Sequence, residues 1–472
     1  MGNICEGGAS WIWEPAAEID ITSLRPDENG IRLEWKDKKP KERYRVLWRE
    51  LREPLYRGNA QGEQAWEEET CEGMCFTIGN LKTCTDYMVK VIDKENARES
   101  AVRFARTGFV PGTVVTHLHP KDDVYAFSGR FLGSPGLVRL PSGALFVCTE
   151  VFGGDSEYGV ALMFRSDDNG ETWNFVNRVR PAFHTSVFVH RNELYLMAVS
   201  GECGDVLIGK STDEGKSWTK PVMLMKGAKK GQNGPQRSSL PVVEKDGWLY
   251  TSIVYGDHKC RTFNPGVMSV KADSDLLNAE NWHISPFTAY DYSWPDAPQG
   301  TCPGSIEGNM VIGPDGGVYN FMRLQQSAGA IPATGKSILY KVNTLDHDAP
   351  MEFVSFVSSP LACSSKFNVH FDEVSGKYIM LGNETLYPDM HAHQRTVLSM
   401  AVSDDLVHWQ LKGRILDYSH MPITDVGLQY PDFIFDGDDI LTVVRTSFNG
   451  AKNEHDSNYV LFVRIENFRN LL

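Results

Sequence analysis

Residues that can transfer protons or bind anions recur at two positions of a repeated strand pattern in this chain. They stand either at the start of an apolar strand segment or in the loop after the next strand segment. The strand starts carry His184, Arg237, Glu307, Lys366, Tyr430 and Asp432, and the following loops carry Asp155, Arg323, Glu384, Arg395, Arg445 and His455. Carboxylates, histidines and tyrosines act as acids and bases, whereas arginines and lysines bind anionic groups. A fold that gathers these segments would hold a site for acid–base chemistry on an anionic ligand, although any exposed loop is also polar.

Six segments share the design of an apolar strand, a short polar or glycine turn, and a second apolar strand. Their turns fall near residues 142, 192, 246, 315, 375 and 437, so successive turns are 50 to 69 residues apart. Such a repeat is typical of β-propellers, in which each hairpin forms the inner half of a four-stranded blade. The sequence therefore predicts a six-bladed β-propeller over residues 109–472. Five blades is the alternative, because the fourth and sixth repeats lack a clear closing motif.

A second repeat is expected to close the blades. SDDNGETW (166–173) and STDEGKSW (211–218) share the pattern Ser-x-Asp-x-Gly-x-Ser/Thr-Trp, and weaker relatives lie at 274–282 and 403–409. The aspartate can accept backbone N–H groups of a tight turn, the glycine permits a positive φ, and the tryptophan can pack into the neighbouring sheet. These motifs are Asp boxes, and the region resembles sialidase-like β-propellers. The boxes are expected to be structural turns, far from the axis.

Propeller topology predicts where a site would form. The hairpin turns and the Asp-box turns lie on one face, so the strand starts and the loops after the second strands reach the other face. Pockets of propellers form where these segments converge on the axis. We therefore expect the acidic, basic and tyrosine side chains of all six repeats to meet at one mouth.

The resemblance to sialidases implies roles for several of these residues. Sialidases use three arginines to grip the sugar carboxylate, a tyrosine nucleophile paired with a glutamate, and an aspartate as acid/base. Glu307 at the start of the fourth inner strand, Arg323 sixteen residues after it and Tyr430 at the start of the sixth inner strand match in type and in blade. The resemblance thus implies that Tyr430 and Glu307 are catalytic. It implies Asp155 as the acid/base, with Glu150 and Glu157 as the alternatives.

Two positions depart from the sialidase pattern. Sialidases open the first blade with Phe/Tyr-Arg-Ile-Pro, but this chain reads FLGSPGLVRLP, with Gly133 and Ser134 in place of the first arginine. In the fifth blade, Lys366 or a later residue such as Arg395 would have to replace an arginine. A lysine is a point donor and glycine donates nothing, so the carboxylate grip would change. Ordinary sialidase activity is therefore not expected.

Residues 20–108 have a different pattern of short alternating strands separated by polar turns about every ten residues. The pattern favours a seven-stranded sandwich with Trp35 in its core. Leu81 and Tyr87 occupy the places of a tyrosine corner, whose hydroxyl ties a crossing loop to the backbone. The region resembles a fibronectin type III domain, which implies a spacer or binding module without chemistry. Residues 1–19 form a preceding N-terminal segment.

The composition restricts the partners. Apolar residues make up 41% of the 472 residues and charged residues 23%, with a net charge of −14. Such an acidic chain is not expected to bind nucleic acid or to insert into a membrane, and it has no apolar run of 18 residues. Its nine scattered cysteines indicate neither a disulfide scaffold nor a zinc site, and no cofactor is expected. Localisation depends on processing: cytoplasmic if Met1 is the native start, secreted or periplasmic if a signal peptide was removed. The oligomeric state is left open.

These observations favour an exo-acting glycoside hydrolase that cleaves a terminal, acidic sugar from a glycan. Asp432 or Glu307 would act directly if the sugar lacked a carboxylate. One alternative is a propeller that binds glycans without catalysis, stacking sugars on aromatic residues. The aromatic candidates are Tyr387, Tyr418 and Trp294. The other alternative is a polysaccharide lyase or unusual glycosidase with Tyr430 as the acid and a histidine as the base, for which the candidates are His184, His391 and His455.

Overall fold

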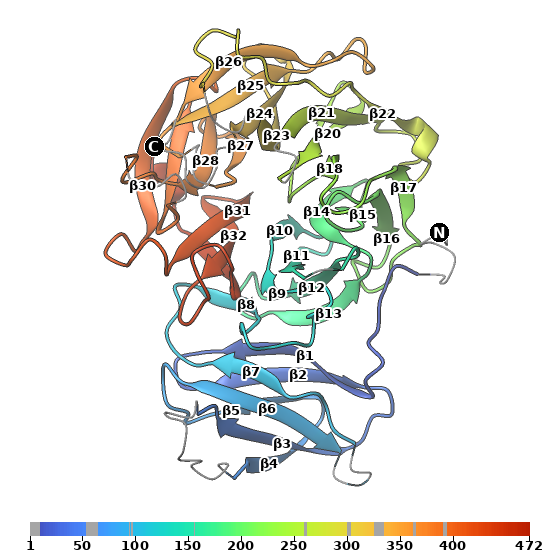
Figure 1. Cartoon of the computed structure of the whole chain (residues 1–472), viewed down its shortest axis with the longest axis vertical. Coiled ribbons are helices and arrows are strands. Elements are labelled where there is room, and N and C mark those ends of the chain that lie inside the picture. Colours follow the sequence, from blue (N-terminus) through green and yellow to red (C-terminus); the bar gives the residue numbers. More distant parts are fainter. Residues whose placement is uncertain are drawn as a thin grey trace.

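The chain folds almost entirely into antiparallel β-sheets, as the computed structural model shows (Figure 1). The structure describes residues 10–52, 65–93, 95, 98–154, 156–258, 262–299, 304–324, 335–361, 365–389 and 394–472. Within these ranges the only helices are two 3-10 turns, η1 (Ala279–Asn281) and η2 (Phe468–Leu471). The predicted all-β class is therefore confirmed. None of the described helices is long and apolar enough to cross a membrane.

The N-terminal part contains two sheets that pack face to face. One sheet contains β1 (Ile19–Pro26), β2 (Ile31–Asp37) and β5 (Cys75–Ile78); the other contains β4 (Glu67–Glu72), β3 (Arg43–Glu50), β6 (Asp86–Asp93) and β7 (Arg103–Arg106). Buried and exposed side chains alternate along β2 and β6, as expected for strands with one face on a core. Trp35 lies in that core, edge-on to Tyr44.

The Tyr87 side chain makes the hydrogen bond expected from the sequence. Its hydroxyl accepts the backbone N–H of Lys82 at 3.0 Å, next to Leu81, which is buried. This bond fastens the connection between β5 and β6 to the sandwich. Cys71 and Cys75 are both free thiols, so no bridge closes the loop between them.

Six further antiparallel sheets in the described part of the chain surround a central axis (Figure 1). The first contains β10 (Gly136–Arg139), β11 (Leu145–Gly153), β12 (Val160–Ser166) and β13 (Asn174–Val179), with β9 (Gly129–Leu132) paired to β11. The second contains β14 (Phe183–His190), β15 (Glu193–Val199), β16 (Val206–Ser211) and β17 (Val222–Met225). In the third, β18 (Gly234–Gln236) and β19 (Val242–Lys245) pair with β20 (Trp248–Asp257), followed by β21 (Thr262–Lys271) and β22 (Trp282–Ile284).

The remaining three sheets complete the ring. The fourth contains β23 (Ser305–Ile312), β24 (Val318–Leu324), β25 (Lys336–Lys341) and β26 (Glu352–Ser358). The fifth contains β27 (Asn368–Asp372), β28 (Lys377–Asn383), β29 (Val397–Ser403) and β30 (Trp409–Asp417). The sixth contains β31 (Gly427–Asp436), β32 (Asp439–Ser447), β33 (Tyr459–Ile465) and β8 (Thr113–His117). Because β8 comes from the other end of this region, its pairing with β33 closes the ring.

The hairpins and the two motifs expected to be Asp boxes lie where the sequence placed them. The first two strands of each sheet form the six expected hairpins, from β10–β11 to β31–β32. The first Asp box joins β12 to β13, where the Asp168 carboxylate accepts the Thr172 backbone N–H at 2.8 Å. Trp173 and Trp218, which end the two clear boxes, are 1% and 3% exposed. The boxes therefore stabilise turns at the outer strands.

The N-terminal segment is part of the ring's packing, which its sequence did not indicate. Ile12 bridges to Val179 on β13, and the Trp13 N–H donates to the Arg178 carbonyl at 2.9 Å. Trp11 is 1% exposed within the core shared by the first two sheets, and its indole N–H donates to the Pro181 carbonyl at 2.9 Å. These residues thus fill the gap between two neighbouring sheets.

Buried arginines join the sandwich to the first sheet of the ring. Arg178 of β13 pairs with Asp20 of β1 and donates to the Tyr125 hydroxyl at 2.8 Å. Arg103 of β7 pairs with Asp122 at 2.5 Å. Both guanidinium groups are almost fully buried, so removing one partner would leave an uncompensated charge.

Replacing Trp11 by alanine is expected to lower the free energy of unfolding by about 3–5 kcal/mol, because a buried indole and its hydrogen bond are lost. Urea unfolding followed by circular dichroism measures the change. Leu345→Ala is the control, since Leu345 is 97% exposed and should change stability by less than about 0.5 kcal/mol. A Trp11→Ala loss as small as that of the control would contradict the packing role.

Candidate active site

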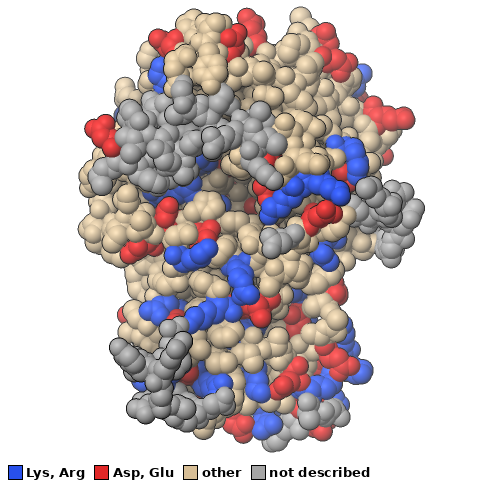
Figure 2. Space-filling view, in the orientation of Figure 1, with Lys and Arg blue, Asp and Glu red and all other residues tan. Residues whose placement is uncertain are grey.

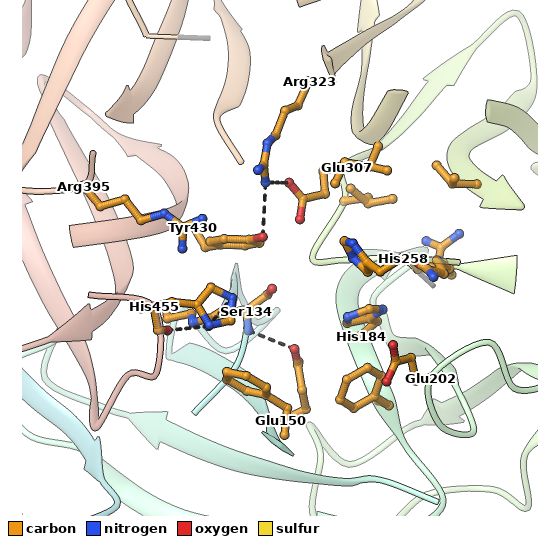
Figure 3. Close-up of a pocket in the computed structure, with 18 residues that line it drawn as sticks. Ser134, Glu150, His184, Glu202, His258, Glu307, Arg323, Arg395, Tyr430 and His455 are labelled. Atoms are coloured by element: carbon orange, nitrogen blue, oxygen red, sulfur yellow. Dashed lines mark hydrogen bonds and ion pairs between the residues drawn. The ribbon is translucent and has the colours of Figure 1, made fainter. Parts of the chain in front are cut away.

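A cavity of about 260 Å³ opens where the inner strands of the ring begin. Figure 2 shows a hollow near the middle of the ring, with Lys and Arg side chains beside it. Among the charged residues that line the cavity are Glu150, Glu202, Glu307, Arg237, Arg323, Arg395 and Arg445. Tyr430, His184, His258 and His455 also line it. Segments far apart in the sequence therefore supply one pocket, and their side chains converge in Figure 3.

Three of these side chains project from the same kind of backbone irregularity. His184, Glu307 and Tyr430 have φ values of 48°, 57° and 53°, in the left-handed region that non-glycine residues rarely adopt. Each lies where the pairing of its inner strand shifts register, in β14, β23 and β31. Such bulges redirect a side chain and are concentrated at functional sites. The same kind of bulge thus turns three chemically active side chains towards the axis of the ring.

Glu307, Arg323 and Tyr430 form the polar centre of the cavity (Figure 3). One guanidinium nitrogen of Arg323, Nη1, lies 2.8 Å from Glu307 Oε2 and 3.3 Å from the Tyr430 hydroxyl. Burial raises the pKa of Glu307, but the charge of Arg323 and a hydrogen bond from the Tyr430 hydroxyl outweigh it, so the pKa falls below its usual 4.5. Glu307 is therefore an ionised carboxylate positioned to accept the tyrosine proton.

Two more arginines flank the Tyr430 ring. The Cζ atoms of Arg395 and Arg445 lie 5.9 and 4.9 Å from its centroid. Arg445 is held by the His455 carbonyl at 2.6 Å and lies 4.5 Å over the Phe152 ring. Burial and the Glu307 charge raise the pKa of Tyr430, while the three arginines act in the opposite direction. The tyrosine is thus neutral at rest and surrounded by groups that would stabilise its anion.

Glu150 faces the same cavity from the end of β11. Its side chain is 2% exposed, and Oε1 accepts the Ser134 backbone N–H at 2.9 Å. Burial raises the pKa of Glu150 to about 7, against a smaller lowering by the Ser134 N–H and by Arg445. The position of this carboxyl depends on Gly133, because a Cβ there would lie 2.2 Å from Oε1. The carboxyl group therefore fills the space that the missing side chain of Gly133 leaves.

His184 is a neutral neighbour of this centre. Burial lowers the pKa of its imidazole to about 3, so it carries no charge near neutrality. Its ring lies 4.2 Å from that of Phe183. A neutral imidazole in this place can exchange hydrogen bonds with a ligand but does not add to the positive potential.

Asp432 and Lys366, both predicted as site residues, do not line the cavity. The Asp432 carboxylate accepts the Leu137 backbone N–H at 2.8 Å and the Asn368 amide at 2.6 Å. Lys366 is fully buried and donates to the Pro431 carbonyl at 3.2 Å. These bonds join the first, fifth and sixth sheets beside the axis. The polar atoms of both side chains thus bond within the protein, whereas the catalytic part expected for Asp432 and the substrate contact expected for Lys366 stay predictions.

Two other predicted residues form bonds within the protein. Arg237 lines the cavity, but its guanidinium donates to the Ser252 carbonyl at 2.9 Å and to two hydroxyl groups. Glu384 does not line the cavity. Its carboxylate forms an ion pair with Arg414 at 3.0 Å. Asp155 lies outside the described residues, as do His391 and His393.

Some lining residues were not among the predicted set. Glu150 was only an alternative to Asp155, and Glu202 and His258 were not predicted as site residues. Their sequence signal was their position after a second inner strand, shared with many surface residues. No group of three or more histidine, cysteine, aspartate or glutamate side chains in the described ranges is arranged to hold a metal ion.

Comparisons with solved structures show a shared fold at low sequence identity. An α-L-arabinanase from Penicillium chrysogenum, complexed with arabinobiose, superposes with a TM-score of 0.52 and 14% identity, covering 77% of this chain and 99% of its own. A mutant α-L-arabinofuranosidase from Fusarium graminearum, with an iminosugar inhibitor, gives 0.51 and 12%, covering 75% and 98%. A Hadza microbial sialidase gives 0.49 and 15%, covering 98% and 99%. The two neighbours above 0.5 are glycoside hydrolases of propeller fold, and the likeness concerns the fold alone. No protein-family model and no curated protein matches the sequence.

Asp432→Ala is expected to lower the free energy of unfolding by about 2–4 kcal/mol, because it leaves a buried backbone N–H, an amide and a nearby lysine without an acceptor. Thermal and urea unfolding measure the effect. Asp425→Ala, at an exposed turn, is the matched control and should have little effect. Unchanged stability of Asp432→Ala, together with lost catalysis, would return Asp432 to a catalytic role.

Proposed function

We propose that this chain is an exo-acting glycoside hydrolase that removes a terminal, acidic sugar from a glycan. The observation that carries the proposal is the single cavity in which ionised Glu307 meets the Tyr430 hydroxyl among three arginines. The propeller fold shared with glycoside hydrolases supports it. The architecture that we propose is a fibronectin type III-like sandwich over residues 20–108, followed by a six-bladed propeller over residues 109–472.

In the proposed reaction Tyr430 is the nucleophile. A tyrosine has an ordinary pKa of about 10, so it needs a base at the moment of attack. Glu307 accepts the phenol proton while the Tyr430 oxygen bonds to the anomeric carbon. The nearby guanidinium groups of Arg323, Arg395 and Arg445 stabilise the developing phenolate. A neutral nucleophile suits a negatively charged sugar, because a carboxylate nucleophile would be repelled.

The arginines also define the proposed substrate class. Three arginines of the cavity belong to the fourth, fifth and sixth sheets of the ring, namely Arg323, Arg395 and Arg445. They concentrate positive charge in the cavity of a protein whose net charge is −14. A cavity of about 260 Å³ suits one sugar ring rather than a polysaccharide chain, which supports exo action. Because Gly133 supplies no guanidinium, the grip on a sialic acid differs from that of sialidases. We therefore expect poor turnover of sialosides and better turnover of other terminal acidic sugars.

The first test combines a substrate panel with Tyr430→Phe. Aryl glycosides of uronic acids and other acidic sugars, a sialic acid glycoside and an α-L-arabinofuranoside are assayed for sugar release. Tyr430→Phe removes one oxygen, so hydrolysis should fall about 1,000-fold or more while stability changes by about 1 kcal/mol or less. Tyr319→Phe, whose hydroxyl bonds to Asp315 at a hairpin end, is the control and should keep full activity.

Several results would count against this function. Release of only the neutral arabinofuranoside would contradict the acidic substrate while leaving a glycosidase. An unsaturated product absorbing in the ultraviolet would indicate a lyase instead. Binding without any product would indicate a glycan-binding propeller.

The pH dependence of the reaction tests the state of Glu307. The base must be ionised, and Arg323 keeps its pKa below 4.5, so activity should fall only as the pH drops below 4.5. Arg323→Met removes the opposing charge and leaves burial to raise the Glu307 pKa. The acid limb of kcat/KM should then move to higher pH, in addition to any loss of rate. An acid limb at the same pH in both proteins would show that Glu307 is not the titrating base.

A further inference from the structure

We propose that Glu150 is the proton donor to the leaving group in this cavity. The inference rests on the proposed glycoside hydrolase function. It assigns a role to a buried carboxyl group that the chemistry of Glu307 and Tyr430 leaves unused.

The structure positions Glu150 by two features of the first sheet. Its Oε1 atom accepts the Ser134 N–H at 2.9 Å, and the Thr185 hydroxyl lies 3.4 Å from Oε2. The carboxyl group occupies space that exists only because residue 133 is glycine, since a Cβ there would overlap it. Ser134 and Glu150 both line the cavity, so the carboxyl group is fixed at its wall.

The three glutamates of the cavity differ in their counter-charges. Glu307 is paired with Arg323 at 2.8 Å, and Glu202 with Lys230 at 3.2 Å. Across the described residues, no lysine or arginine forms an ion pair with Glu150. A buried carboxyl group without such a partner holds its proton more tightly, which is the property that a general acid needs.

The groups facing Glu150 keep it close to neutrality. Arg445 lowers its pKa but does not contact it closely enough to form a pair, and Lys366 is a more distant positive charge. Cys148 on the same strand stays a neutral thiol, because burial raises its pKa to about 12. Burial dominates, and the pKa of about 7 leaves a large protonated fraction in weakly acidic solution.

The cavity is thereby divided into two halves (Figure 3). Arg323 and Arg395 lie on the side of Tyr430 and can bind the anionic group of the sugar. Glu150 and the neutral His184 lie on the other side, towards the first and second sheets. A leaving group on this side would have a proton donor beside its glycosidic oxygen.

The protons of the two reaction steps are exchanged among groups of the cavity and one water molecule. In the first, the glycosidic C–O bond breaks and its oxygen takes the Glu150 proton, while Tyr430 oxygen bonds to the anomeric carbon and its proton passes to Glu307. In the second, the Glu150 carboxylate takes a proton from water, whose oxygen bonds to the anomeric carbon. The Tyr430–carbon bond breaks, and the tyrosine regains its proton from Glu307. No oxidant or metal ion is needed.

The test compares leaving groups in Glu150→Gln, using an acidic sugar that the wild type hydrolyses. An alkyl glycoside needs protonation, so its hydrolysis should fall by about 100-fold or more. Release of dinitrophenol from the same sugar needs no protonation, so glycosylation should fall by less than about tenfold. In single-turnover measurements the wild type should show an alkaline limb near pH 7 with the alkyl glycoside, and this limb should be absent with the dinitrophenyl glycoside. Equal losses on both substrates with an unchanged alkaline limb would overturn the assignment.

A second variant moves the Glu150 carboxyl group without removing it. Gly133→Ala keeps Glu150 but displaces its carboxyl group, so it should reproduce the selective loss on the alkyl glycoside. Glu193→Gln, which removes an ion pair with Lys210 away from the cavity, is the control and should keep the wild-type ratio of the two substrates. If the wild type hydrolyses an acidic glycoside but both variants keep that ratio, only the Glu150 assignment fails. If the wild type releases no sugar from any substrate, the proposed function fails and the assignment with it.

Discussion

The buried ion pair between Glu307 and Arg323 is the interaction on which the proposed chemistry of this site depends. Burial alone would favour a protonated glutamate, which could not accept the phenol proton of Tyr430. Arg323 reverses that preference from 2.8 Å away and contacts the tyrosine hydroxyl with the same nitrogen. In the proposed reaction, one guanidinium group therefore positions the base and the nucleophile and stabilises their charge, although the residues come from two different sheets.

The ring positions these side chains through bulges in its inner strands. Glu307, Tyr430 and His184 each occupy a left-handed bulge on an inner strand, where the strand would otherwise alternate its side chains between the two faces of a sheet. The backbone cost of such positions is of the order of 1–3 kcal/mol each and must be offset by the packing around them. Buried bonds of Asp432 and Lys366 beside the axis supply part of that packing. The site and the ring are thus stabilised by different residues.

Much of the architecture could be predicted because it is repetitive. The hairpins, the turns expected to be Asp boxes and the Tyr87 hydrogen bond follow from periodicity and turn chemistry. The same periodicity predicted that Glu307, Arg323 and Tyr430 would line one cavity. Asp432 could not be separated from Tyr430, because residues two apart share a strand face until a bulge intervenes. The sequence did not show whether Lys366 or Arg395 would line the cavity, since the answer depends on how the loop that carries Arg395 folds towards the axis. The place of Glu150 depends on the missing side chain of Gly133, a contact between strands that no local pattern reveals.

The most direct measurement of the central claim is the identity of the residue that becomes covalently attached to the sugar. An acidic sugar with a good leaving group and a fluorine beside its anomeric carbon forms the glycosyl–enzyme quickly but releases it slowly, so the adduct can be digested and located by mass spectrometry. The account predicts a single labelled residue, Tyr430, and no label in Tyr430→Phe. A label on Glu307 or another carboxylate, or turnover with inversion and no adduct, would contradict it.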